Sequence, residues 1–149
     1  MSAMISPHRK TPIIRALEAL SGAESLLISG HVRPDGDALG STLALGRLLT
    51  RHGNRITVCA DPTLLGSPGF LSSCGPLVSP AKVAGNTYDL MVVLDCGAFD
   101  RIPEPLQPLA RNVPLLNIDH HRTNSRFGAI NWIDAAASST SEMIWKLAK

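Results

Sequence analysis

One histidine and two aspartates lie close together in the segment HVRPDGD, residues 31–37. They are His31, Asp35 and Asp37. A turn can use Asp and Gly for conformational reasons alone, since both tolerate tight backbone geometry. Imidazoles and carboxylates together are also the ligands that suit borderline divalent ions such as Mn²⁺, with Co²⁺, Fe²⁺ or Zn²⁺ as alternatives. The rest of the chain must decide between a turn and a metal site.

Two more groups of the same chemical kind follow apolar runs. Asp95 comes at the end of YDLMVVLD, and Asp119, His120 and His121 come at the end of PLLNIDHH. Each group alone has a plain structural explanation, as a strand-end cap, a solvated pair or a core histidine. Whether these groups form one metal site depends on whether the fold brings them together.

The apolar pattern predicts strands that alternate with helices. We expect helices within residues 11–22, 37–53 and 138–149, and strands within residues 25–30, 54–60, 88–97, 114–121 and 128–134. Residues 61–76 are rich in Gly, Pro and Ser and are expected to be mostly loop. Ser139 and Glu142 have the spacing of a capping box at the start of the last helix.

This order predicts one α/β domain over residues 1–149, with a mainly parallel sheet flanked by helices on both faces. Ligands of such sheets bind beyond the carboxyl ends of the strands. His31, Asp95 and the Asp119–His121 group all fall at these ends, so we expect them to converge on one edge of the sheet.

The converging groups suit two divalent ions, which at a spacing of about 3.5–4 Å can clamp a phosphoryl group. Asp95 ends a central apolar strand and is the natural bridging ligand, because metal coordination compensates the cost of burying a carboxylate. His31 and Asp35 can face one ion while Asp37 faces the other.

Composition excludes several other classes of protein. Aromatic residues make up 4% of the chain, too few for a base-stacking platform, and the net charge of +2 is too small for a surface that coats nucleic acid. No apolar run reaches the roughly 18 residues of a membrane span, and the leading segment lacks the apolar region of a signal peptide. Cys59, Cys74 and Cys96 have no metal-binding or disulfide pattern and indicate reduced thiols in a cytoplasmic protein.

Four segments, in this order, resemble the motifs of the DHH phosphoesterase superfamily: HVRPDGDALGS, VVLDCG, IDHHRTN and ASSTSEM. The first and last most resemble its NrnA-type group of bifunctional oligoribonucleases and PAP phosphatases. The resemblance covers about residues 10–149. It implies a phosphoesterase that uses two ions, usually Mn²⁺, and metal-activated water. The implied substrates are short oligonucleotides, dinucleotides or the nucleoside bisphosphate 3′-phosphoadenosine 5′-phosphate.

The resemblance also implies roles by position. His31, Asp35 and Asp95 would bind the first metal, and Asp37, Asp95 and His120 the second. His121 would approach the substrate phosphate and Asp119 would orient the neighbouring histidine, which makes both catalytic candidates. Arg33 and Arg122 flank the motifs and could contact substrate or solvent. Ser139 is a further substrate-binding candidate, although helix capping explains Ser138, Ser139 and Thr140 as well.

The family pattern extends past these residues. A further motif supplies another aspartate to the second metal, and a C-terminal domain of the DHHA1 type binds substrate. Neither occurs here, and the positions of Asp134 and Glu142 do not recommend them as substitutes, so we expect a C-terminally truncated DHH domain with an incomplete second site. The alternatives are a non-catalytic metal- or nucleotide-binding fragment, one that pairs with a separate chain, and a pyrophosphatase of the same superfamily. An apolar edge exposed by truncation would favour a homodimer.

Overall fold

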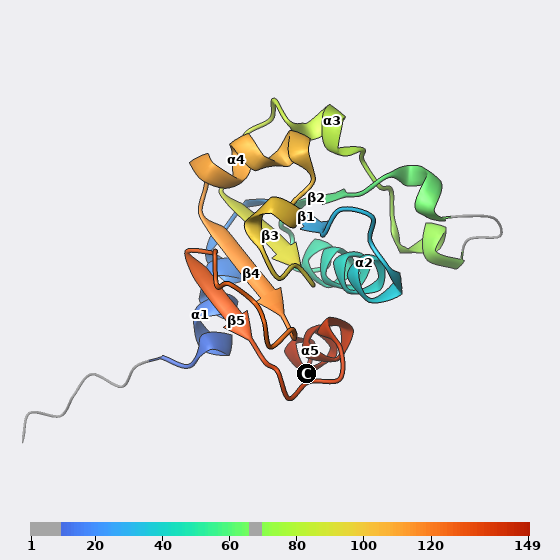
Figure 1. Cartoon of the computed structure of the whole chain (residues 1–149). Coiled ribbons are helices and arrows are strands. Elements are labelled where there is room, and N and C mark those ends of the chain that lie inside the picture. The colour runs from blue at the N-terminus through green and yellow to red at the C-terminus, as the bar shows by residue number, and fades with distance from the viewer. Residues whose placement is uncertain (1–9, 66–69) are drawn as a thin grey trace, which may run out of the picture.

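The computed structural model of the chain describes residues 10–65 and 70–149 (Figure 1). The expectations for the leading segment before residue 10 and for residues 66–69 of the loop lie outside the described residues. The described part contains these helices and strands: α1 (Pro12–Gly22), β1 (Ser25–Gly30), α2 (Gly36–Thr50), β2 (Arg55–Cys59), α3 (Pro80–Val83), β3 (Leu90–Leu94), α4 (Gln107–Asn112), β4 (Leu115–Asp119), β5 (Ile130–Ile133) and α5 (Thr140–Leu147). Every predicted strand and helix is therefore present.

The five strands form one sheet in the order β2-β1-β3-β4-β5, and each neighbouring pair is parallel. This confirms the predicted parallel sheet. Strand β2 lies on one side of β1, whereas β3, β4 and β5 follow on its other side. The direction in which strands are added therefore reverses between β1 and β3. In open parallel sheets this switch point is where ligands bind, outside the carboxyl ends of the strands.

Helices cover both faces of the sheet, as predicted (Figure 1). Residues of α1, α2 and α5 pack with Ile28, Val92 and Ile118 on one face. Residues of α3 and α4 pack with Met91 and Val93 on the other. Every residue of β3 is buried, which follows from having helices on both sides of a central parallel strand.

The element boundaries differ from the expectations in small ways. Helix α2 ends at Thr50, and Gly53 follows with a positive φ of 87°, a conformation that glycine adopts without a steric penalty. The Pro-rich stretch 103–114 contains the short helix α4. No helix in the described ranges is long and apolar enough to cross a membrane. Cys59, Cys74 and Cys96 are free thiols in the structure.

Candidate active site

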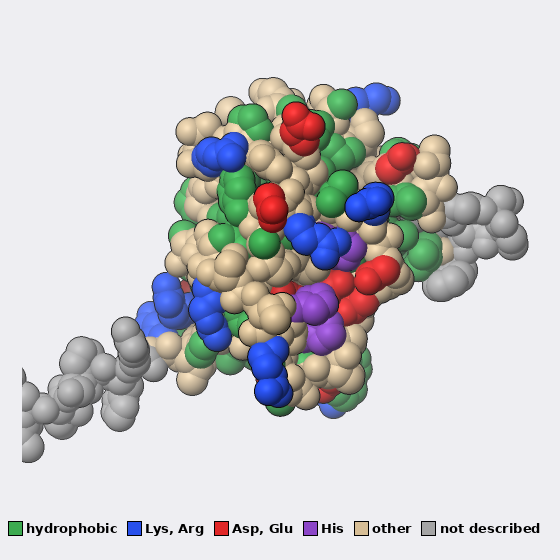
Figure 2. All heavy atoms as spheres, viewed as in Figure 1, with side chains coloured by type: hydrophobic (Ala, Val, Ile, Leu, Met, Phe, Trp, Pro, Cys, Tyr) green, Lys and Arg blue, Asp and Glu red, His purple; other side chains and the backbone are tan. Residues whose placement is uncertain are grey.

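The predicted site residues meet at the carboxyl edge of the sheet. His31 directly follows β1, Asp95 directly follows β3, and Asp119 is the last residue of β4. Figure 2 shows histidine and acidic side chains together on one face of the molecule, with Lys and Arg side chains nearby. The structure thus places side by side residues that lie far apart in the sequence, as the parallel-sheet argument predicts.

The turn after β1 is built so that α2 starts against the strand end. A Cβ atom on Gly30 would lie 3.2 Å from the Cβ of Ala38, so glycine permits this close approach. Asp35 is the N-cap of α2, and its Oδ1 accepts a hydrogen bond of 2.9 Å from the backbone N–H of Ala38. This leaves Oδ2 of Asp35 free to face His31.

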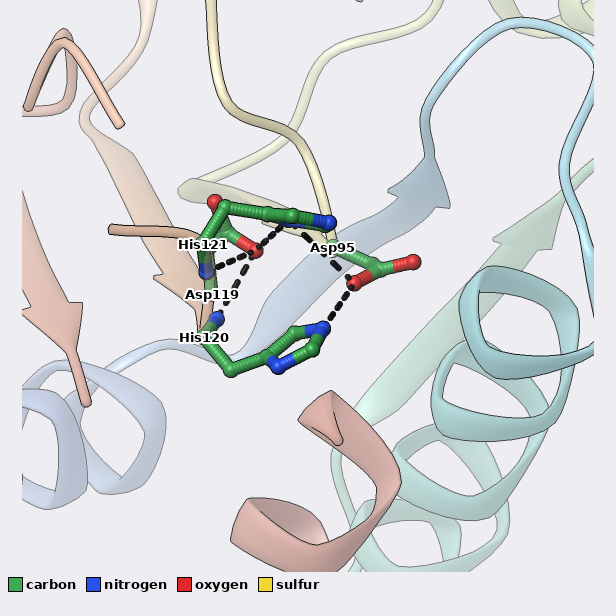
Figure 3. A group of neighbouring side chains, drawn as sticks. All are labelled: Asp95, Asp119, His120 and His121. Atoms are coloured by element: carbon green, nitrogen blue, oxygen red, sulfur yellow. Dashed lines mark hydrogen bonds and ion pairs between the residues drawn. The ribbon is translucent and has the colours of Figure 1, made fainter. Parts of the chain in front are cut away.

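Asp95 is at the centre of the site. Its side chain is 2% exposed, and its backbone has a φ of 57°, in the left-handed region that non-glycine residues rarely adopt. Oδ2 lies 3.7 Å from Nε2 of His31. Oδ1 lies 3.5 Å from Nε2 of His120, a contact that Figure 3 draws. The two oxygens of one buried carboxylate therefore face different histidines, and Oδ1 also lies 3.7 Å from Nδ1 of His121.

Two groups of potential ligands share this carboxylate. In the first group, Nε2 of His31 lies 3.8 Å from Oδ2 of Asp35 as well as close to Asp95. In the second group, Nε2 of His120 lies 3.6 Å from Oδ2 of Asp37. We call these the His31 group (His31, Asp35, Asp95) and the His120 group (Asp37, Asp95, His120).

The separations fit divalent ions better than direct contacts. They exceed the roughly 2.7–3.2 Å of hydrogen bonds to nitrogen. Two ligand atoms that each lie roughly 2.1 Å from one ion are separated by roughly 3.0–3.6 Å, close to the observed spacing. The ligand atoms of the His31 group all lie within 4.8 Å of one another. Nδ1 of His31 lies 2.8 Å from the carbonyl oxygen of Val32, so a proton on Nδ1 leaves Nε2 as a lone-pair donor.

Asp37 is held by the start of α5. Its Oδ2 accepts from the backbone N–H of Thr140 at 2.9 Å, and its Oδ1 accepts from the N–H and hydroxyl of Ser141 at 2.8 and 2.7 Å. Partial burial opposes ionisation, but these hydrogen bonds outweigh it and lower the pKa of Asp37. The lowered pKa favours the ionised carboxylate of Asp37, which is the form that binds a cation.

The pKa of Asp95 is shifted in the opposite direction to that of Asp37. Burial raises its pKa to about 6, the hydroxyl of Thr140 works against this rise, and the nearby carboxylate of Asp37 adds to it. A buried carboxylate with a second acidic group beside it is costly unless a cation compensates it. The donor set of histidine and aspartate therefore fits a divalent cation at this place.

The three consecutive residues at the end of β4 have different surroundings: Asp119 contacts His121, whereas His120 faces Asp37 and Asp95. Asp119 is fully buried; its Oδ1 accepts from Nδ1 of His121 at 2.6 Å, and its Oδ2 accepts from Nδ2 of Asn124 at 2.7 Å (Figure 3 draws the first contact). Both of its oxygens are thus engaged, which suits Asp119 to orienting His121 rather than to binding metal. Asn117 and Asn124, which support this arrangement through a hydrogen bond of 2.8 Å, were not among the predicted residues.

The other predicted residues lie as follows. Arg33 and Arg122 are exposed. Ser139 caps α5 by accepting from the N–H of Glu142 at 3.0 Å, as the capping-box spacing predicts, whereas the Glu142 carboxylate accepts from Ser138. Asp134 accepts from the N–H of Ala136 in the turn before α5, and neither acidic residue belongs to a group of potential metal ligands in the described residues.

Arg101 was not predicted. It lies on a 3-10 turn after β3, and one of its guanidinium nitrogens is 3.2 Å from Nδ1 of His31. The carbonyl oxygen of Arg101 also accepts from the N–H of Val32 at 2.8 Å, which fixes this turn against the loop after β1. No spacing signal marks Arg101, because the contact joins two loops.

Comparison with known proteins identifies a family and several relatives of this chain. The sequence profile described as "DHH family, N-terminal domain" matches residues 25–149. The bifunctional oligoribonuclease and PAP phosphatase NrnA of Bacillus subtilis is 33% identical over 140 residues, which cover 93% of this chain and 41% of that protein. The protein of the same name from Thermus thermophilus is 33% identical over 138 residues, covering 89% of this chain and 38% of its own length. The chain thus spans about two fifths of these relatives.

Solved structures share the fold. An exopolyphosphatase-related protein of Bacteroides fragilis superposes with a TM-score of 0.74 at 27% identity, covering 99% of this chain and 44% of that one. RecJ of Thermus thermophilus in complex with Mn²⁺ superposes with a TM-score of 0.53 at 18% identity, over 92% of this chain and 19% of its own, a likeness of fold alone. With the family profile matched over residues 25–149, the chain belongs to the DHH family.

Proposed function

We propose that this chain carries the metal-binding site of a phosphoesterase that hydrolyses short oligonucleotides, dinucleotides or 3′-phosphoadenosine 5′-phosphate. The observation that carries the proposal is the position of Asp95, whose two carboxylate oxygens lie 3.7 Å from His31 and 3.5 Å from His120. The substrate class rests on the names of the NrnA relatives, which are bifunctional oligoribonucleases and PAP phosphatases.

The His31 group would hold one divalent ion and the His120 group a second, with Asp95 shared. Mn²⁺ is the favoured ion, because imidazole and carboxylate together suit it better than they suit Mg²⁺. When bound, such a pair of ions activates water and polarises the phosphoryl oxygens. The free cysteines agree with a reducing, cytoplasmic environment.

The protein's own side chains supply the remaining functions. His121 is 47% exposed and its Nδ1 is held by Asp119, so its Nε2 can exchange a proton or a hydrogen bond with a substrate at the site. Arg101 and Arg122 offer guanidinium groups at the edge of the site, and neither has an ion-pair partner among residues 10–65 and 70–149. Guanidinium groups match the geometry of phosphate oxygens. Ser139 contributes a hydroxyl at the start of α5.

Hydrolysis of a 5′-phosphorylated diadenylate by the purified chain in Mn²⁺ tests the proposal. We expect turnover that is abolished in Asp95→Asn and unchanged in Asp61→Asn, a matched loss of charge at an exposed aspartate that binds Thr63. The chain could instead bind Mn²⁺ but hydrolyse none of the diadenylate, 3′-phosphoadenosine 5′-phosphate and pyrophosphate. That result would overturn the proposal and indicate a binding module. Hydrolysis of pyrophosphate alone would assign a pyrophosphatase instead.

A further inference from the structure

The start of α5 contacts both carboxylates that face His120. We propose that Thr140 and Ser141 are positioning residues that set the geometry of the His120 group, an inference that rests on the proposed function. The contacts that support this proposal are long-range in the sequence. Thr140 contacts Asp95, 45 positions away, and the start of α5 contacts Asp37, about a hundred positions away.

The first contact holds Asp37. Two backbone N–H groups of α5, those of Thr140 and Ser141, donate to the two different oxygens of this carboxylate, and the Ser141 hydroxyl adds a third hydrogen bond. A carboxylate with a donor on each oxygen cannot rotate without breaking one of them. The same oxygen that accepts from Thr140 lies 3.6 Å from Nε2 of His120.

The second contact holds Asp95. The Thr140 hydroxyl, which is fully buried with its residue, donates to Oδ1 of Asp95 at 2.9 Å. Oδ1 is the oxygen that faces His120, whereas the oxygen that faces His31 is Oδ2. Threonine is branched at Cβ and has a restricted χ1, so its hydroxyl is well defined. Thr140 therefore acts on the His120 side of the shared carboxylate.

Helix α5 owes its position to packing elsewhere. Met143 and Ile144 are buried in the core against the sheet, and the N-terminus is closed by Ser139, which accepts from Glu142. The core packing and the N-cap therefore fix the start of α5, and this in turn fixes the donors that contact Asp37 and Asp95. In the His31 group, the hydrogen-bond partners of His31 and Asp35 lie outside α5, at Val32, Arg101 and Ala38. The two groups should respond differently to changes in α5.

Titration with Mn²⁺, followed by electron paramagnetic resonance and equilibrium dialysis, tests the inference without reference to turnover. In Thr140→Val, which keeps the shape but removes the hydroxyl, we expect the Mn²⁺ affinity of the His120 group, identified as the one that His120→Ala also weakens, to fall by roughly 10-fold or more, as for other groups that orient metal ligands. The other affinity stays within about 2-fold. Thr140→Ser restores the hydroxyl and should restore both affinities.

Thr42→Val is the matched control. Thr42 is buried on α2, and its hydroxyl donates to the carbonyl oxygen of Ala38 at 2.6 Å rather than to a candidate ligand. Both affinities should stay unchanged even where thermal stability falls. Ser141→Ala provides a second test if Thr140→Val does not fold. It removes one of the three hydrogen bonds to the Asp37 carboxylate, so a smaller loss confined to one Mn²⁺ is expected.

The result separates this inference from the proposed function. Asp95→Asn is titrated alongside and should weaken both Mn²⁺ affinities. Unchanged binding in Asp95→Asn means that the metal centre is wrong, and both proposals fall. Weakened binding in Asp95→Asn with wild-type binding in Thr140→Val and Ser141→Ala overturns the positioning role alone. Equal loss at both ions in Thr140→Val also overturns it.

Discussion

His121 and Asp119 form a close pair at the end of β4, with Nδ1 of the imidazole 2.6 Å from Oδ1 of the carboxylate. The carboxylate is fully buried, whereas the His121 side chain is 47% exposed. One end of the imidazole is therefore anchored in the protein, and the other nitrogen, Nε2, remains for a substrate. This arrangement resembles an acid–base histidine oriented by a buried aspartate.

Replacing His121 should reduce turnover while sparing the metal. In His121→Gln we expect kcat to fall roughly 10²- to 10⁴-fold, the usual contribution of a positioned acid–base group. Mn²⁺ content should be retained, because His121 belongs to neither ligand group. Steady-state kinetics together with metal analysis checks this. His52→Gln, at an exposed histidine after α2, should behave like the wild type. A large loss of Mn²⁺ in His121→Gln would contradict the separation of roles.

Asp119 should act through His121, and a double-mutant cycle can establish this. Asp119→Asn removes the negative charge that holds the Nδ1 proton and should lower kcat, with Mn²⁺ content again retained. The double variant with His121→Gln should be no slower than His121→Gln alone, since coupled residues give non-additive effects. Additive losses in the four kinetic measurements would mean that Asp119 acts independently, for instance as a direct metal ligand.

The two ligand groups predict different metal losses in histidine variants. His31→Ala removes the only imidazole of the His31 group, and His120→Ala removes that of the His120 group. Each should weaken one of the two Mn²⁺ affinities by roughly 10-fold or more and leave the other nearly unchanged, because Asp95 still serves the intact group. Mn²⁺ titration checks this. Equal loss of both ions in either variant would show that the division into two groups is wrong.

Much of the site could be predicted because one rule of fold topology governs it. His31, Asp95 and Asp119 each follow a run of buried strand residues, and a parallel sheet brings such positions to one edge. The period of the apolar residues identifies the strands, so convergence follows without knowledge of any side-chain contact.

The support around the ligands could not be predicted in the same way. Thr140 was expected to cap a helix or to bind substrate phosphate, yet its hydroxyl donates to Asp95. Asp37 was expected near the start of α2, but the amides that bind it belong to α5. Such contacts depend on how helices pack over the sheet and leave no periodic signal. Arg101 lies on a 3-10 turn whose position depends on loop-to-loop contacts.

Arg101 should contribute to substrate binding. Its guanidinium group lies 3.2 Å from the Nδ1 atom of His31, at the edge of the site. In Arg101→Gln we expect KM for the 5′-phosphorylated diadenylate to rise roughly 10- to 100-fold, since a hydrogen bond to a charged group contributes about 1.5–3 kcal/mol. kcat should change less. Arg15→Gln, at an exposed arginine on α1, is the matched control. An unchanged KM, or loss of Mn²⁺ alone, would assign Arg101 to supporting His31.

Asp95 should make the metal-free chain less stable than a neutral variant. Burial raises its folded pKa to about 6, above the ordinary value of 3.8. Ionisation therefore favours the unfolded chain, and stability is lost as pH rises from about 4 through about 6. By pH 8 this loss amounts to about 3 kcal/mol at most. In EDTA, Asp95→Asn should thus be more stable than wild type by about 1–3 kcal/mol at pH 8, with a gain below about 1 kcal/mol at pH 4.

Urea unfolding at the two pH values measures this difference directly. Adding Mn²⁺ at pH 8 should reverse the order, because an ion that binds only the folded wild type stabilises it and leaves Asp95→Asn nearly unchanged. A variant that is less stable than wild type in EDTA at pH 8 would show that Asp95 supports the fold without a cation. The buried carboxylate would then need no metal to explain it, and the position of Asp95 would lose its weight as evidence for the metal centre.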